Sequence, residues 1–211
     1  MNAKFFDLKK EKQDRMINAA LKVFALHGYR HASTDDIVKE AAISKGLLFH
    51  YFGSKLGVYS FIYDYSVKYM ALELSTAVSA KQTDMFEILK QQEFARMQAM
   101  KGYPYMQQFL NRSMSEDVEE AVNAVSEMKT AYLLKNEELI GQMDFSFLPV
   151  GTDARKLLKM MDLTIKGVMT ERFFDESFQP EMLYEEVVSY LDLVKKLTVP
   201  ASPSEEDLEN S

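Results

Sequence analysis

The chain has 211 residues, of which 47% are hydrophobic and 27% charged, as in an ordinary soluble globular protein. Cysteine is absent, which excludes disulfides, thiolate metal sites and thiol nucleophiles. No uncharged apolar run approaches the roughly 18 residues that suggest a membrane span, and the first ten residues are too charged for a signal peptide. We therefore expect a cytoplasmic protein that makes no membrane contact.

The net charge of −7 is unevenly divided along the chain. Residues 1–60 contain ten Lys and Arg against six Asp and Glu, whereas residues 61–211 contain fifteen against twenty-six. Only the first 60 residues therefore suit a polyanionic partner such as DNA. A solvated surface without any partner would carry the same charge, so charge alone does not establish that these residues bind a polyanion.

Residues 10–27 predict a first helix, because apolar residues recur at helical spacing in one stripe: Ile17, Leu21 and Phe24. Gly28 follows as a C-terminal stop. Further helices are predicted downstream, at about 55–80, 84–101, 104–112, 115–142, 153–175 and 180–198. Residues 199–211, with two Pro and four acids, predict a disordered tail. Together with two short helices at residues 33–41 and 45–52, these segments predict an all-α fold of about nine helices.

Two short helices follow the first one, at residues 33–41 and 45–52. Each begins with side chains that can cap a helix: Ser33, Thr34 and Ser44. Two short helices joined by a tight turn and braced by a third form a helix-turn-helix. Leu48 and Phe52 would face the core, which leaves other faces of the third helix free to enter a DNA major groove.

This region resembles the head of the TetR family of transcription regulators. The resemblance covers roughly residues 10–60 and is carried by three ordered stretches: LKVFALHGY (21–29), STDDI (33–37) and AAISKGLLFHYFGSK (41–55). It implies an N-terminal three-helix head followed by a helical domain that binds an effector and dimerises. The corresponding divisions are a DNA-binding head at 1–54, an effector-binding and dimerisation domain at 55–198, and an acidic tail at 199–211.

The resemblance also implies which head residues contact DNA. Phosphate contacts are implied for four hydroxyl or ammonium side chains: Thr34, Ser44, Tyr51 and Lys55. The outer face of the third helix would approach base edges: Lys45, Gly46, Leu47, Phe49 and His50. Leu47 and Phe49 stand where relatives often carry hydroxyls, which favours contact with thymine methyl groups and some A·T preference. Without DNA, Thr34 and Ser44 would still serve as helix caps, and Phe49 and Tyr51 would still pack.

Ala42 stands where a glycine is common in the turn of this family. If its backbone is left-handed, the side chain would strain the turn by roughly 1 kcal/mol.

Residues 61–211 contain twelve Met, nine Phe and eight Tyr, which suit an adaptable apolar pocket. The expected effector pocket is lined by residues of the fourth to eighth helices: Tyr63, Tyr69, Phe94, Met97, Tyr105, Phe109, Arg112, Met128 and Tyr132. Arg112 could hold a carboxylate or phosphate of the effector. All three histidines lie before residue 51, so we expect an organic, hydrophobic effector, no metal and no cofactor. An ordinary helical core would have the same composition.

The last two helices carry apolar stripes at residues Leu157, Met161, Ile165, Val168, Met169, Leu183, Val187, Leu191 and Val194. By resemblance, these stripes would pair with their twofold mates in a four-helix dimer seam, where Gly167 permits close approach. A core within one chain would produce the same stripes.

These features predict a TetR-type, ligand-responsive regulator, a repressor that binds a palindromic double-stranded DNA operator as a homodimer and is released by a small organic effector. An enzyme is not expected, because the sequence lacks a nucleophile elbow, a glycine-rich phosphate loop and any histidine beyond the head. The alternative is an all-α small-molecule or lipid-binding protein without regulatory DNA binding, which would leave the first 60 residues unexplained.

Overall fold

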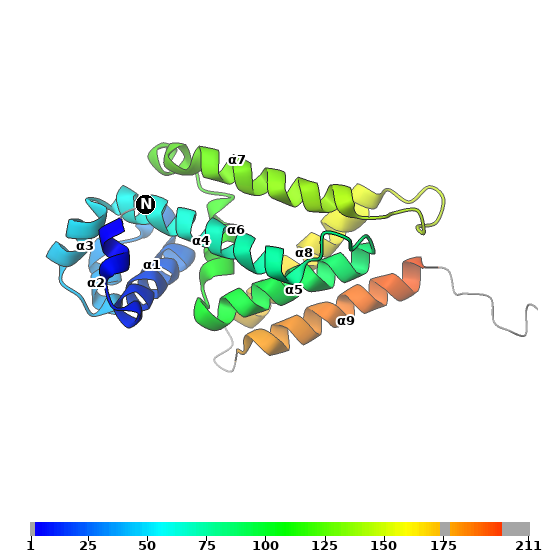
Figure 1. Ribbon diagram of the computed structural model, residues 1–211, viewed down its shortest axis with the longest axis horizontal. Coiled ribbons are helices and arrows are strands. Elements are labelled where there is room, and N and C mark those ends of the chain that lie inside the picture. The colour runs from blue at the N-terminus through cyan, green and yellow to red at the C-terminus, as the bar shows by residue number, and fades with distance from the viewer. Residues whose placement is uncertain (1–2, 174–177, 200–211) are drawn as a thin grey trace, which may run out of the picture. The chain divides into compact units, whose positions relative to one another are not determined.

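The computed structural model describes residues 3–173 and 178–199 (Figure 1). Within them, a short 3-10 helix, η1 (Ala3–Asp7), precedes nine α-helices, and no strand forms beyond an isolated bridge between Asp84 and Asp144. The α-helices are α1 (Lys10–His31), α2 (Thr34–Ala41), α3 (Lys45–Phe52), α4 (Lys55–Ala77), α5 (Met85–Gly102), α6 (Met106–Ser113), α7 (Glu119–Gln142), α8 (Ala154–Phe173) and α9 (Pro180–Thr198). The all-α prediction is confirmed. The predicted tail lies outside the described residues from position 200 onward.

The helices form two compact units. Unit 1 comprises residues 3–76 and 98–138, and unit 2 comprises residues 77–97, 139–173 and 178–199. Helices α5 and α7 each continue from one unit into the other. None of the described helices is long and apolar enough to cross a membrane.

Helix α1 is the centre of unit 1, because it packs against both α2 and α6. Its predicted stripe of Ile17, Leu21 and Phe24 is at most 1% exposed, and Ile37 of α2 and Leu48 of α3 join the same core. The core extends beyond the first three helices through aromatic contacts. The ring of Tyr59 in α4 lies 5.1 Å from that of Phe24 and 5.6 Å from that of Phe109 in α6.

The helical geometry of α1 breaks at Gly28, as predicted. Gly28 has φ 65° and ψ 178°, a conformation that is essentially restricted to glycine, and one further turn follows it. The guanidinium of Arg112 lies against the glycine, since a Cβ there would be 2.9 Å from Nε. The break frees the amide of Tyr29, which donates to the Glu116 carboxylate at 3.0 Å. The end of α1 is therefore bonded to the segment that leads into α7.

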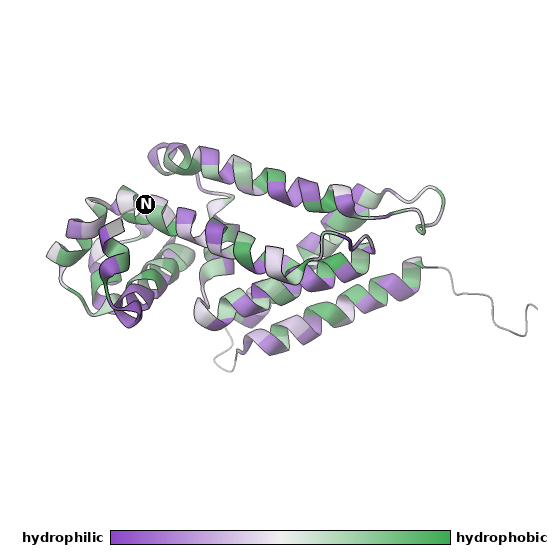
Figure 2. Cartoon of the chain, in the orientation of Figure 1, coloured by the Kyte–Doolittle hydropathy of each residue, from purple (hydrophilic) through white to green (hydrophobic). Residues whose placement is uncertain are grey.

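Unit 2 is held together by apolar packing and by ion pairs between α5 and α9. Lys90 of α5 pairs with Asp192 of α9 at 2.7 Å, and Lys195 of α9 pairs with Asp84 at 3.3 Å. Both hydrophobic and hydrophilic residues occur along α8 and α9 (Figure 2). Each of these helices can therefore bury one face inside the unit and expose another.

Candidate nucleic-acid interface

Serine side chains cap both helices of the helix-turn-helix. The hydroxyl of Ser33 accepts a hydrogen bond from the amide of Asp35 at 3.1 Å, and that of Ser44 accepts one from the amide of Leu47 at 3.2 Å. The capping role of Ser44 is confirmed. At α2 the cap is Ser33, and Thr34 is the half-buried first residue of the helix. The start of each helix is thus fixed by its own sequence.

The turn between these helices contains Ala42 in the left-handed conformation, with φ 51° and ψ 52°. Among the described non-glycine residues it is the only one with positive φ. Its amide donates to the carbonyl of Lys39 and thereby ends α2. Ala42 therefore meets the condition under which the sequence predicts strain, because its Cβ is sterically disfavoured in this conformation.

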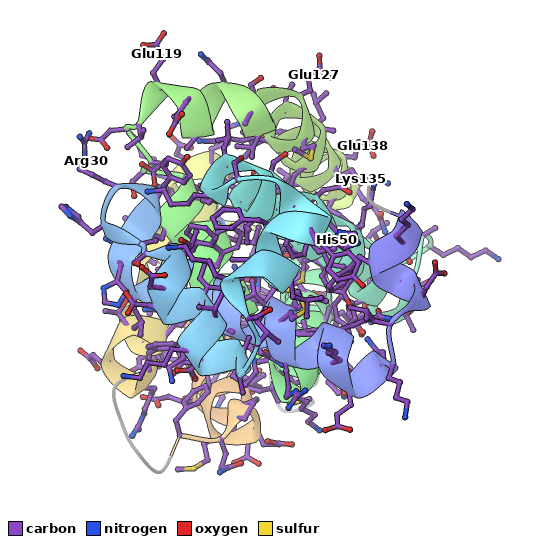
Figure 3. The ribbon with its side chains drawn as sticks, turned by 90° about the vertical axis from the view of Figure 1, so that its left-hand side faces the viewer. Arg30, His50, Glu119, Glu127, Lys135 and Glu138 are labelled. Carbon is purple, nitrogen blue, oxygen red and sulfur yellow. The ribbon has the colours of Figure 1, made fainter. Side chains whose placement is uncertain are left out.

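Helix α3 buries one side chain and exposes the opposite face. Leu48 is 1% exposed, whereas Lys45, Gly46 and His50 are exposed and Leu47 and Phe49 are half-buried. A Cβ added to Gly46 would meet no atom within 4 Å, so the backbone is open to close approach there. Figure 3 views unit 1 from the end at which α3 lies and labels His50. This exposed face is short and unobstructed within unit 1, as insertion into a groove requires.

Lys45 forms an ion pair with Asp35 at the start of α2. The ammonium lies 2.7 Å from the carboxylate, and both side chains are more than half exposed. Such an exposed pair adds little to stability. The pair links the start of α3 to the start of α2.

Lys55 stands at the start of α4, as predicted, but its ammonium has an internal partner. It donates to the carbonyl oxygen of Tyr29 at 2.9 Å and lies 4.3 Å from the centre of the Tyr29 ring. A longer contact of 3.4 Å reaches the carbonyl of Ala32. The side chain is half-buried. Lys55 thus joins α4 to the end of α1 and the turn before α2, and the phosphate contact that the resemblance implied stays a prediction.

Residues 16–60 match the model of a protein family described as bacterial regulatory proteins, tetR family. These residues span most of α1, both helices of the helix-turn-helix and the start of α4. Over this segment the chain is similar to the TetR family of bacterial regulatory proteins.

Solved structures of other regulators share the fold over most of the chain. A TetR family transcriptional regulator from Chloroflexus aurantiacus J-10-FL superposes with a TM-score of 0.61 at 20% identity, over 94% of this chain and 98% of the other. The fatty acid degradation regulator FadR from Bacillus halodurans superposes with a TM-score of 0.56 at 21% identity, over 87% of this chain and 95% of FadR. The HTH-type transcriptional regulator YuxN of Bacillus subtilis strain 168 is 35% identical over 111 residues, which span 47% of this chain but only 38% of YuxN.

The residues predicted to line an effector pocket lie in both units. In unit 1, Tyr63 and Phe109 are at most 1% exposed, and four more are half-buried: Tyr69, Tyr105, Met128 and Tyr132. In unit 2, Met97 is buried, whereas Phe94 is 41% exposed and packs against Tyr184 of α9. The pocket remains a prediction for these residues.

Arg112 lines a 400 Å³ polar hollow with His27, Arg30 and His31, where its guanidinium lies against Gly28. Its contact with an effector stays a prediction.

The hydroxyl of Tyr63 is one of several buried side-chain polar atoms of unit 1 without a hydrogen-bond partner in the described part of the chain. The side chain is 0% exposed, and its Oη has no hydrogen-bond partner among the described residues. Burial and the charge interaction with Tyr132 raise the pKa of Tyr63 to about 12, although the nearby Ser113 side chain opposes the shift. It is consequently a neutral donor at physiological pH, and buried donors of this kind normally have a partner.

The apolar stripes predicted to form a dimer seam lie inside one chain. Eight of the residues are at most 9% exposed, and Val194 is half-buried: Leu157, Met161, Ile165, Val168, Met169, Leu183, Val187, Leu191 and Val194. Side chains that their own chain already covers have little surface left for a partner. Periodicity identifies a buried stripe without saying which surface buries it, and the participation of these residues in a dimer seam stays a prediction.

Proposed function

We propose that this protein is a TetR-family repressor that binds a palindromic operator as a homodimer and dissociates when a small organic effector binds. The observation that carries the proposal is the outer face of α3, where Lys45, Gly46 and His50 are exposed while Leu48 fixes the helix to the core. The surplus of basic residues in the first 60 positions supports a polyanionic partner.

Dimerisation follows from the short length of α3. A helix of eight residues reaches only a few base pairs, so a specific site needs a second head. Two heads related by a dyad would read half-sites about 34–36 Å apart, one helical turn of DNA. The operator is therefore proposed to be an inverted repeat.

The proposed seam is the exposed face of α8 and α9. Large apolar side chains are 40–76% exposed along this face: Met160, Leu163, Met182, Tyr190, Leu193 and Leu197. Gly167 lies on α8 four residues after Leu163 and has no neighbour within 4 Å of a Cβ position, which leaves room for a second helix. Large exposed apolar side chains that gather along two helices are typical of a protein–protein contact surface. We assign it to a second copy of the chain.

The effector is proposed to bind against α4 inside unit 1, with Tyr63 donating a hydrogen bond to its polar group. Helix α4 carries Tyr63 and, at its start, Lys55 with its bonds to Tyr29. A ligand that shifts α4 would therefore shift the helix-turn-helix. The shift can be no larger in free energy than the difference in effector affinity between the two states.

The test is selection of bound sequences from a pool of random duplexes, followed by gel shifts on the selected site. We expect an inverted repeat and an affinity that falls steeply with salt. His50→Ala should change the preferred bases, whereas His27→Ala, an exposed histidine outside α3, should not. Failure to enrich any sequence at moderate salt would contradict the proposal.

A further inference from the structure

The N-terminal 3-10 helix η1 places an aromatic side chain against the end of α3. Phe5 is 0% exposed. Its ring centre lies 5.8 Å from that of Tyr51 and 5.4 Å from that of Phe52, in the last turn of α3, and 4.9 Å from that of Phe61 in α4. Phe5 therefore fills the space between the recognition helix and α4.

The position of Phe5 is fixed by hydrogen bonds to α1. The side-chain amide of Gln13, which is 7% exposed, donates to the carbonyls of Phe6 at 3.1 Å and Leu8 at 2.7 Å. The amide of Leu8 donates to the carbonyl of Phe5 at 3.2 Å. A buried glutamine with both bonds directed at one turn holds that turn in a single conformation. Segment η1 is consequently a fixed part of unit 1.

Helix α3 needs this contact because it has few others. Leu48 is its only fully buried side chain. The second attachment is the last turn, where Tyr51 and Phe52 are half-buried and pack on Phe5 and Phe61. If Phe5 is removed, the last turn loses one wall and α3 can pivot about Leu48. Recognition of bases depends on such orientation, because the hydrogen bonds to base edges are directional.

We propose that Phe5 is a positioning residue for sequence recognition, which sets the orientation of α3 by filling the gap between its last turn and α4. The proposal rests on the proposed reading of DNA by α3. Phe5 precedes the matched residues 16–60, so this contact is added by the chain outside the segment that resembles the family. Residues 3–9, which precede α1, are then part of the structure that recognises DNA.

The experiment compares Phe5→Ala and Phe5→Leu with two controls in the full-length protein. Phe6→Ala removes a neighbouring ring that is 38% exposed and touches Phe61. Val125→Ala removes buried apolar volume from α7, away from α3, and controls for lost stability. The readout is the ratio of affinities for the selected operator and for random duplex DNA, measured on protein whose folded fraction is checked by circular dichroism.

Phe5→Ala should lower this ratio about tenfold while the affinity for random DNA and the salt dependence stay unchanged, because base recognition weakens while the attraction to phosphates persists. The affinity ratio of Phe5→Leu should lie between those of Phe5→Ala and the wild type, about threefold below the wild-type ratio. An unchanged ratio in folded Phe5→Ala, or an equal loss in Val125→Ala, would overturn the proposal. If Phe5→Ala does not fold, Phe5→Leu decides by the same criterion.

A second readout needs no DNA. Amide hydrogen exchange in residues 45–52 should accelerate at least about tenfold in the Phe5 variants while residues 34–41 keep their wild-type rate, because local opening follows local packing. Equal acceleration in both helices would overturn the positioning role. If the wild type selects no sequence but α3 alone is loosened, the proposed function fails and the contact of Phe5 with α3 stands.

Discussion

The ammonium of Lys55 lies 2.9 Å from the carbonyl oxygen of Tyr29 and 4.3 Å from the centre of its ring. Tyr29 is itself bonded to the start of α7, where Glu116 accepts from its amide at 3.0 Å and Glu120 accepts from its hydroxyl at 2.6 Å. One tyrosine thus joins α4, the end of α1 and α7.

Lys55→Met should lower the free energy of unfolding by about 1–2 kcal/mol, because a half-buried carbonyl loses a charged donor. It should leave the slope of log affinity against log salt unchanged, because the ammonium is engaged within the protein. Lys45→Met is the matched control. Its ammonium is exposed on the face of α3 proposed to enter the groove, and the exposed pair with Asp35 can open when DNA binds, so its removal should reduce the slope by about 0.9. A reduced slope for Lys55→Met would restore the phosphate contact that the resemblance implied.

Ala42→Gly should raise the free energy of unfolding by about 0.5–1 kcal/mol, because glycine adopts the left-handed turn without the Cβ penalty. Urea denaturation measures the change. The same substitution at exposed Ala131, inside α7, should instead cost about 1 kcal/mol. Destabilisation by both substitutions would show that the turn at Ala42 is not strained.

The head was largely predictable because its structure is local. Ser44 caps α3 and Leu48 turns inward because of residues within one helical turn, and the observed bounds of α3 equal the predicted ones. Segment η1 was missed. Five residues with Phe5 and Phe6 carry no periodicity, and Phe5 is buried by α3 and α4, some fifty residues later in the chain.

The candidate contact residues were harder to predict, because a side chain's partners are set by folding. The motif located Lys55 at the start of α4 but gave no sign that the break at Gly28 would present the Tyr29 carbonyl to it. Similarly, the periodicity of the stripes on α8 and α9 predicts burial, but it is the same whether the same chain or a second chain buries them. Exposure of residues such as Leu163 separates the two cases.

Leu163→Asp and Leu193→Asp should each convert the proposed dimer to a monomer, because a carboxylate would be buried unpaired in the seam. Both side chains are more than half exposed in the single chain, so folding should be retained. Leu134→Asp on α7, where the leucine is 59% exposed, is the matched control and should leave the mass unchanged. Analytical ultracentrifugation reports the mass, and loss of specific operator binding should accompany the monomer. A dimeric Leu163→Asp protein would place the seam elsewhere.

Glu93 of α5 gives unit 2 a defined pH dependence. The carboxyl group is 6% exposed, and burial raises its pKa above the usual value of 4.5, although the paired Arg96 guanidinium opposes the shift; the charge of Asp162 reinforces it. A carboxyl whose pKa is higher in the folded protein contributes stability below its unfolded pKa and loses that contribution as pH rises through the folded value.

The free energy of unfolding of the wild type, relative to Glu93→Gln, should therefore fall as pH rises from about 4.5. Urea denaturation across this range measures the difference, and Glu138→Gln, which removes an exposed carboxylate, controls for net charge. If the free energy of unfolding of the wild type, relative to Glu93→Gln, instead increases with pH, the pair with Arg96 outweighs burial.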